Sequence, residues 1–267
     1  MSRLILITND DGISAKGIRT LARLMASLGE VYVVAPDAAR SGAACSVTFT
    51  QAVELKQTRE FIPGSTDAPD LPPRHAMHFY RCSGTPVDCI KLACEQVIPR
   101  RPDLVVSGIN HGDNASSSIH YSGTMGAVIE ACMKGIPAIG YSLQTFDPDA
   151  DFTPYEQAIV KIAEQTLSTG LPAGVCLNVN FPQVEELKGI KVARMGRGTW
   201  TSEWVSACHP YRNNLFWLTG HFDNLEPEAQ DTDTWALDHG YASVVPIRID
   251  MTAHDCLEKL QSSLSFS

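Results

Sequence analysis

The chain has 267 residues, of which 44% are hydrophobic and 19% are charged, so it can bury a sizeable core. Its 30 acidic and 21 basic residues give a net charge of −9, which argues against duplex nucleic-acid binding, because such binding needs a basic surface. The sequence contains no apolar stretch near the roughly 20 residues of a membrane span, and its first residues lack a signal-peptide pattern. We therefore expect a cytoplasmic protein with no membrane partner, whose eight cysteines are reduced.

The first part of the chain alternates short apolar strands with amphipathic helices. The clearest helix start combines Thr85 as N-cap, Pro86 at the first helical position and Asp88 in the first turn. The alternation predicts an α/β fold with a mostly parallel sheet and helices on both faces. Strands are predicted over 4–8, 31–35, 104–107, 138–141 and 175–180, and helices over 15–28, 85–97, 124–134 and 152–167.

The remaining segments are predicted from composition and alternation. Residues 46–55 alternate as an exposed or edge strand would, and residues 57–78, rich in Pro, Asp and charge, indicate a long loop or protruding arm. Residues 194–241 hold all four tryptophans and indicate β-hairpins that pack on the core or on another subunit. A last strand over 242–249 and a short helix over 256–260 follow.

Two adjacent acids follow the first predicted strand, in the run Asn9-Asp10-Asp11-Gly12. Ligands of open α/β sheets bind at the carboxyl ends of the strands. Neighbouring carboxylates repel each other unless a positive charge lies between them, and carboxylate oxygens suit Mg²⁺ or Mn²⁺. The same residue types are common in turns, so this run alone leaves a plain turn open.

Three more loops should converge on the same edge of the sheet. Two carboxylates, a hydroxyl and an amide oxygen make an oxygen-only ligand set, which suits a hard divalent ion rather than a structural zinc. The run from Ser122 to Thr124 opens a predicted helix and would offer backbone N–H groups to a phosphate. A metal beside an anion site is the minimum equipment for hydrolysing a phosphomonoester. The polar residues of these loops are Arg40, Ser41, Ser107, Asn110, His111, Asn114, Tyr121, Ser122 and Thr124.

Several motifs in this order resemble the SurE family (survival protein E), and the resemblance extends over nearly the whole chain. They are Ile7-Thr8-Asn9-Asp10-Asp11-Gly12-Ile13, then Ala35-Pro36 followed by Arg40-Ser41-Gly42, and the runs 84–89, 105–114, 121–127, 177–182 and 231–241. The resemblance implies one domain over 1–267. It would have a Rossmann-like α/β core over about 1–182 and a β-hairpin-rich extension over about 183–267 that exchanges hairpins or tails between subunits, giving a homodimer or homotetramer.

The resemblance also implies an activity and its residues. A metal-dependent phosphatase would hydrolyse nucleoside monophosphates at the 5′ or 3′ position through a metal-activated water, with one Mg²⁺ or Mn²⁺ per subunit. We expect Asp10, Asp11 and Asn9 to act in catalysis, and His111 is a candidate acid for the leaving oxygen. The expected metal ligands are Asp10, Asp11, Ser41 and Asn110, and the residues expected around the phosphate are Asn9, Ser107, Gly108, Ser122, Gly123 and Thr124.

The chain departs from the family pattern at two places, and three other functions compete. The charged stretch 57–78 is long, and Val245 stands where a threonine is expected before Pro246, which puts the form of the oligomer in question. A signalling receiver domain needs an acid where the 104–107 strand ends, but this chain has Ser107-Gly108-Ile109-Asn110. A haloacid-dehalogenase-type phosphatase spaces its acids as Asp-x-Asp. A non-catalytic nucleotide-binding module would bind without both acids.

Overall fold

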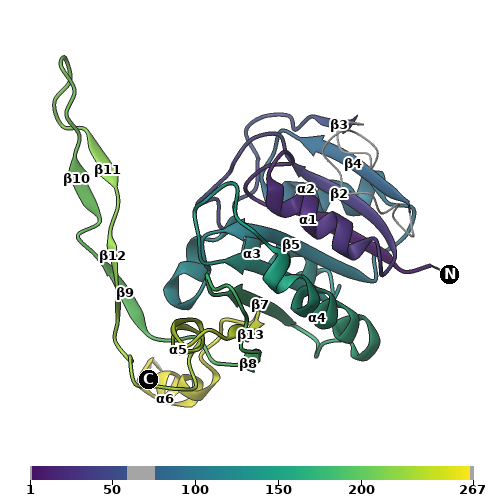
Figure 1. The fold of residues 1–267 in the computed structure, drawn as a ribbon. Helices are drawn as coiled ribbons and strands as arrows, with labels where there is room; N and C mark the ends of the chain where they lie inside the picture. The colour runs from purple at the N-terminus through teal and green to yellow at the C-terminus, as the bar shows by residue number, and fades with distance from the viewer. Residues whose placement is uncertain (1, 59–75, 265–267) are drawn as a thin grey trace.

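A nine-stranded sheet flanked by helices forms the body of the computed structural model, which describes residues 2–58 and 76–264 (Figure 1). Neighbouring strands are parallel except that β3 is antiparallel to β4 and β13 is antiparallel to β7. This confirms the predicted mostly parallel sheet. In spatial order the strands are β3 (Leu55–Thr58), β4 (Met77–Cys82), β2 (Glu30–Pro36), β1 (Leu4–Thr8), β5 (Leu104–His111), β6 (Ala138–Leu143), β7 (Val175–Phe181), β13 (Ala242–Arg248) and β8 (Ile190–Val192).

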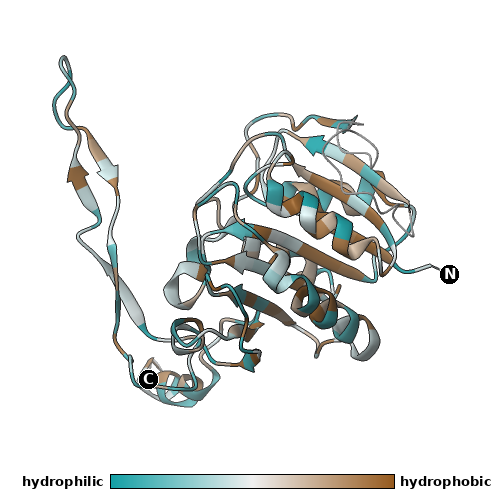
Figure 2. Ribbon diagram, viewed as in Figure 1, coloured by the Kyte–Doolittle hydropathy of each residue, from teal (hydrophilic) through white to brown (hydrophobic). Residues whose placement is uncertain are grey.

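Helices cover both faces of the sheet, as the alternating pattern predicts. Successive side chains of a strand point to opposite faces, so Ile5 and Ile7 of β1 join one apolar core while Leu4 and Leu6 join a second. The first core includes residues of α1 and α4, and the second includes residues of α2 and α3. Hydrophobic residues dominate the central strands in Figure 2. These helices are α1 (Lys16–Met25), α2 (Pro86–Leu92), α3 (Gly123–Met133) and α4 (Glu156–Thr169).

The start of α2 shows how local sequence signals fix an element. Thr85 Oγ1 accepts from the backbone N–H of Asp88 at 3.1 Å, and Asp88 Oδ2 accepts from the backbone N–H of Thr85 at 2.9 Å. This reciprocal pair is a capping box, which satisfies two N–H groups that a helix start leaves without partners. The helix continues through a π-helical turn at Ala93–Val97, so its predicted end at residue 97 is confirmed.

The prediction for residues 46–55 is wrong, because only β3 forms a strand there, beginning at Leu55. The preceding residues bond to the α2 start instead of a ladder: Thr48 donates to Asp88, and the backbone carbonyl of Ser46 accepts from Thr85 Oγ1. The predicted loop over 57–78 is wrong at both ends, which belong to β3 and β4. Its middle, 59–75, lies outside the described residues.

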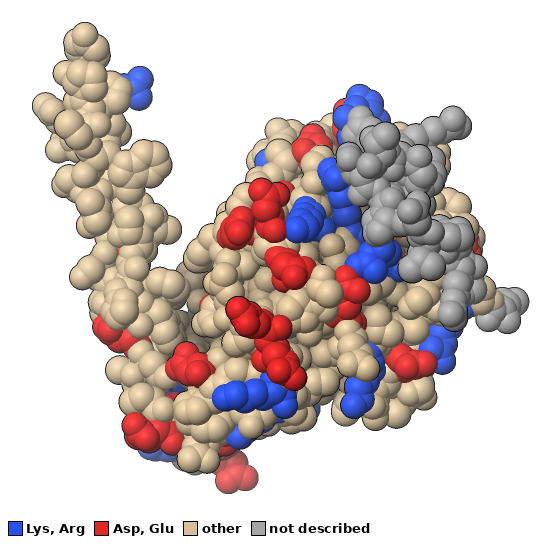
Figure 3. All heavy atoms as spheres, in the orientation of Figure 1, with Lys and Arg blue, Asp and Glu red and all other residues tan. Residues whose placement is uncertain are grey.

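The last part of the chain forms β-hairpins, as predicted, and they build an arm over residues 198–224 that projects away from the body (Figure 1). At its base β9 contacts residues 116–121 of the body, but the outer strands β10 and β11 are exposed, so packing on the core is wrong for them, while packing on another subunit stays a prediction. Its surface in Figure 3 carries few charges. The paired strands are β9 (Gly198–Thr201) with β12 (His221–Asn224), and β10 (Trp204–Ser206) with β11 (Phe216–Leu218).

Two short helices lie near the C-terminus. The sequence pattern missed α5 (Asp233–Asp238), which is too short for helical periodicity and begins where Thr232 Oγ1 accepts from the Trp235 N–H at 3.2 Å. The predicted terminal helix is present as α6 (Leu257–Leu264), one residue later than its predicted start. Beyond residue 182, β8 and β13 complete the main sheet.

All eight cysteines are free thiols, as predicted for a reduced chain. Over residues 2–58 and 76–264, no helix combines the length and apolar character needed to cross a bilayer.

Candidate active site

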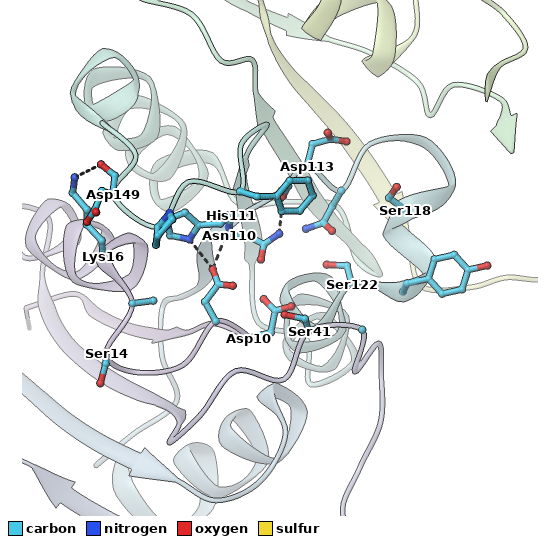
Figure 4. A pocket seen from close by; sticks show the side chains of 18 of the residues that line it. Asp10, Ser14, Lys16, Ser41, Asn110, His111, Asp113, Ser118, Ser122 and Asp149 are labelled. Atoms are coloured by element: carbon cyan, nitrogen blue, oxygen red, sulfur yellow. Dashed lines mark hydrogen bonds and ion pairs between the residues drawn. The ribbon is translucent and has the colours of Figure 1, made fainter. Parts of the chain in front are cut away.

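A pocket of about 830 Å³ opens at the carboxyl ends of β1 and β5. All four residues of the predicted metal-ligand set line it, together with Ser122 from the start of α3. In Figure 4 the side chains of Asp10, Ser41, Asn110 and Ser122 gather around one space. The convergence of separate loops predicted from the sequence is therefore present in the fold.

Asp10 is the most buried of the expected ligands, with 4% of its surface exposed. Thr124 Oγ1 donates to Asp10 Oδ1, and the backbone carbonyl of Asp10 accepts from the Arg40 N–H at 2.7 Å. Burial raises the pKa of Asp10 to about 6, and the negative charge of Asp11 adds to that rise, although the hydrogen bond from Thr124 opposes it. A buried carboxylate beside a second carboxylate favours a bound cation.

Asp11 is held by His111, the residue that follows Asn110. Its Oδ2 accepts from the backbone N–H of His111 at 3.1 Å and lies 3.0 Å from His111 Nδ1. The His111 ring packs edge-on against Phe152 with 5.6 Å between ring centroids. His111 Nε2 is buried and has no hydrogen-bond partner within the described part of the chain. The imidazole therefore orients Asp11 through Nδ1.

The residues present fit a hard divalent ion. Asn110 Nδ2 donates to the Gly112 carbonyl at 2.6 Å, which leaves Asn110 Oδ1 as the amide atom for a cation. Ser41 adds a hydroxyl, so the set consists of oxygen atoms only, as Mg²⁺ and Mn²⁺ prefer. Across residues 2–58 and 76–264, no group of three or more His, Cys, Asp or Glu side chains forms a metal site. The fit therefore depends on Ser41 and Asn110 as much as on the acids.

Five of the six residues predicted around the phosphate lie behind the pocket wall rather than on it, namely Asn9, Ser107, Gly108, Gly123 and Thr124. Asn9 Nδ2 donates to the Gly12 carbonyl at 2.9 Å and so braces the acidic loop. Asn9 Oδ1 and Ser107 Oγ are buried with no hydrogen-bond partner among the residues that the structure describes. Gly108 packs against the Tyr141 carbonyl. These residues shape the floor beneath the carboxylates.

The start of α3, where the sequence predicts an anion site, reaches the pocket wall at Ser122. Ser122 is its N-cap, and its Oγ accepts from the Met125 N–H at 3.0 Å. A Cβ at Gly123 would lie 2.8 Å from Asp10 Cβ, so only glycine lets the helix approach β1 this closely. The N–H groups of Gly123 and Thr124 have no acceptor within the helix, because they belong to its first turn. Donors for an anion thus lie beside the acid pair.

Part of the pocket wall carries no motif that the sequence singles out. Lys16 and Arg19 come from the first turn of α1, and Phe146 and Asp149 come from the loop after β6. Because β6 is parallel to β5 and next to it, the loop after β6 reaches the same edge of the sheet. Lys16 Nζ donates to the Asp149 carbonyl at 2.8 Å and joins these two elements. Strand order, which the sequence does not reveal, was the missing information.

Comparison with known proteins identifies the family of this fold and site. The family model described as Survival protein SurE matches residues 5–202. A protein of Phocaeicola vulgatus named 5′-nucleotidase SurE is 49% identical over 259 residues, which cover 97% of this chain and 96% of that protein. A protein of the same name from Bacteroides thetaiotaomicron is 47% identical over 257 residues, covering 96% and 94%.

The crystal structure of SurE protein from Aquifex aeolicus superposes with a TM-score of 0.80 and 32% sequence identity, covering 98% of this chain and 100% of that one. The match in sequence and the match in fold cover the acid pair, the sheet and the helix start that build the pocket. The chain therefore belongs to the SurE family.

Proposed function

We propose that this chain is a phosphomonoesterase that hydrolyses nucleoside 5′- and 3′-monophosphates with one Mg²⁺ or Mn²⁺ in each subunit. The observation that carries the proposal is the meeting of Asp10 and Asp11 with the start of α3, where Gly123 touches Asp10. The relatives from Phocaeicola vulgatus and Bacteroides thetaiotaomicron, both named 5′-nucleotidase SurE, support it.

The divalent ion would be held by Asp10, Asp11, Ser41 and Asn110, whose oxygen atoms line the pocket. Bound there, it would offset the charge of the phosphate and acidify a coordinated water. Thr124 and His111 fix the two carboxylates through hydrogen bonds to Asp10 Oδ1 and Asp11 Oδ2. These contacts hold the ligands in place before any ion arrives.

The phosphate would lie against the first turn of α3. The N–H groups of Gly123 and Thr124 would donate to its oxygens and stabilise the charge that grows in the transition state. Asn9 already donates to the Gly12 carbonyl and would reach a phosphate oxygen only with its other N–H. Ser107 and Gly108 would act from beneath, by setting the position of the loop.

The nucleoside would occupy the rest of the pocket, whose volume of about 830 Å³ exceeds what a phosphate needs. His111 is the candidate to protonate the leaving oxygen, because it lines the pocket; Nδ1 faces Asp11, so the transfer would use Nε2. The pairing with Asp11 would keep the ring oriented during the transfer.

Assembly into a homodimer or homotetramer is part of the same proposal. The arm presents large apolar side chains to solvent, including Trp204 at 63% and Trp217 at 68% exposure. Exposed aromatic surface on a projecting hairpin is typical of protein interfaces. A second copy of this chain would cover it.

The experiment measures phosphate release from matched 5′- and 3′-nucleoside monophosphates in EDTA, then after addition of Mg²⁺ or Mn²⁺. We expect no release in EDTA and release from both positional isomers with metal. Release that persists in EDTA would contradict metal dependence, and release from one isomer alone would restrict the proposal to that position.

A further inference from the structure

We infer that Phe146 is the residue that stacks on the nucleobase and makes this pocket prefer nucleotides over base-free sugar phosphates. The inference rests on the proposed function, because it assigns the part of the substrate that lies beyond the phosphate. Phe146 belongs to the loop after β6 and lines the pocket that holds Asp10 and Asn110. None of the motifs that define the expected metal and phosphate sites includes it.

Phe146 presents its ring to the pocket rather than to the core. Its side chain is 87% exposed although it lines a pocket, so the ring contributes little to the core and leaves a free aromatic face. Most other residues on the wall are polar or charged, including Lys16, Arg19 and Asp149. A flat apolar group among polar groups is typical of a site that orients an aromatic ligand.

The Phe146 ring lies against Gly112, next to the loop that carries Asn110. A Cβ on Gly112 would lie 2.7 Å from Phe146 Cε1, so the ring rests against the Gly112 backbone. The carbonyl of Gly112 accepts from the Asn110 side chain at 2.6 Å. Phe146 thus lies beside the loop that carries an expected metal ligand, against a residue two positions along the chain from Asn110.

Gly112 also explains how the ring keeps this place. Its φ of +108° favours glycine, and the absence of a side chain makes room for the ring. Tyr121 is the other aromatic residue of the pocket wall, but it lies next to Ser122, at the expected phosphate end. The base would therefore lie toward Phe146.

The test compares hydrolysis of 5′-AMP and ribose 5-phosphate by the native protein, Phe146→Ala and Phe146→Trp. Stacking of a base on an aromatic ring changes binding by about five-fold to about a hundred-fold. We expect Phe146→Ala to lower kcat/KM for 5′-AMP by that factor, mainly through KM, to leave ribose 5-phosphate unchanged, and Phe146→Trp to restore 5′-AMP. The matched control is Phe49→Ala, because Phe49 is 88% exposed and does not line the pocket.

A second readout does not depend on metal or turnover. Saturation-transfer NMR with adenosine in EDTA should show transfer to the base protons from the native protein and from Phe49→Ala, and loss of that transfer in Phe146→Ala. Equal loss of activity on both substrates, or unchanged activity and transfer in Phe146→Ala, would overturn the inference. Phe146-dependent transfer to adenosine in a protein that releases no phosphate would support stacking and reject the proposed phosphatase.

Discussion

At the scale of single residues, the Asp10 carboxylate is needed for the proposed activity but lowers the stability of the metal-free fold. Burial raises its pKa to about 6, so an ionised Asp10 costs the metal-free fold stability at pH 8. Asp10→Asn should abolish phosphate release and yet raise the unfolding temperature in EDTA by several degrees, since a pKa shift of this size corresponds to about 3 kcal/mol. Scanning calorimetry at pH 8 measures it.

The matched variant is Asp11→Asn. It removes one carboxylate charge at the same site, but the Asp11 side chain is less buried than that of Asp10 and accepts hydrogen bonds from His111. We expect it to lose activity with a smaller gain in unfolding temperature than Asp10→Asn, because removing the Asp11 charge relieves only part of the rise in the Asp10 pKa. If Asp10→Asn unfolded in EDTA at or below the unfolding temperature of the native protein, ionised Asp10 would not be destabilising the metal-free fold.

At the scale of elements, the capping box of α2 links a surface loop to the sheet. Burial opposes ionisation of Asp88, but hydrogen bonds from Thr48 and Thr85 outweigh it and lower its pKa. The stabilisation is present above the ordinary pKa of an aspartate and is lost as pH falls through the lowered value. Asp88→Asn should lower the free energy of unfolding by about 1–2 kcal/mol at pH 7, with a smaller difference near pH 3.

Urea denaturation at both pH values measures this effect, and Glu95→Gln, a carboxylate change beyond the end of α2, serves as control. A difference from the native protein that stays constant down to pH 3 would show that the ionised Asp88 is not what stabilises the helix start.

Sequence patterns predicted the elements whose signals are local. The apolar run of β1 and the cap and proline of α2 place these elements without tertiary information. By contrast, β4 and α5 were missed, because β4 has mixed burial and α5 is a helix of six residues. Residues 46–54 alternate like a strand but bond to α2, a competition between partners that only the folded chain decides.

The pocket, too, contains residues that the sequence predicts and residues that it does not. Asp10, Asp11, Ser41 and Asn110 were predicted to meet because they follow strand ends, and they do line one pocket. Phe146 was not predicted, because a single exposed phenylalanine in a loop has no periodicity. Its place in the pocket depends on β6 lying next to β5 in the sheet.

At the scale of the whole molecule, the arm exposes large apolar side chains that the body does not cover. Among the described residues its strands pair only with each other, so a partner is what would bury its exposed tryptophans. Trp217→Lys should reduce the molar mass measured by light scattering toward that of a smaller assembly. Asn213→Lys, which adds the same charge near the tip of the arm, should leave the mass unchanged. A native mass of 29.0 kDa would contradict assembly itself.

The most direct measurement is phosphate release from 5′-AMP during titration of the metal-free protein with Mn²⁺, run on the native chain, Asp11→Asn and Asp255→Asn. Asp255 is an exposed acid near the C-terminus and controls for the loss of one charge. We predict that release rises and saturates with Mn²⁺ for the native chain and Asp255→Asn, and stays at background for Asp11→Asn. Native activity without metal, or full metal-dependent activity in Asp11→Asn, would contradict a divalent-ion site at the end of β1.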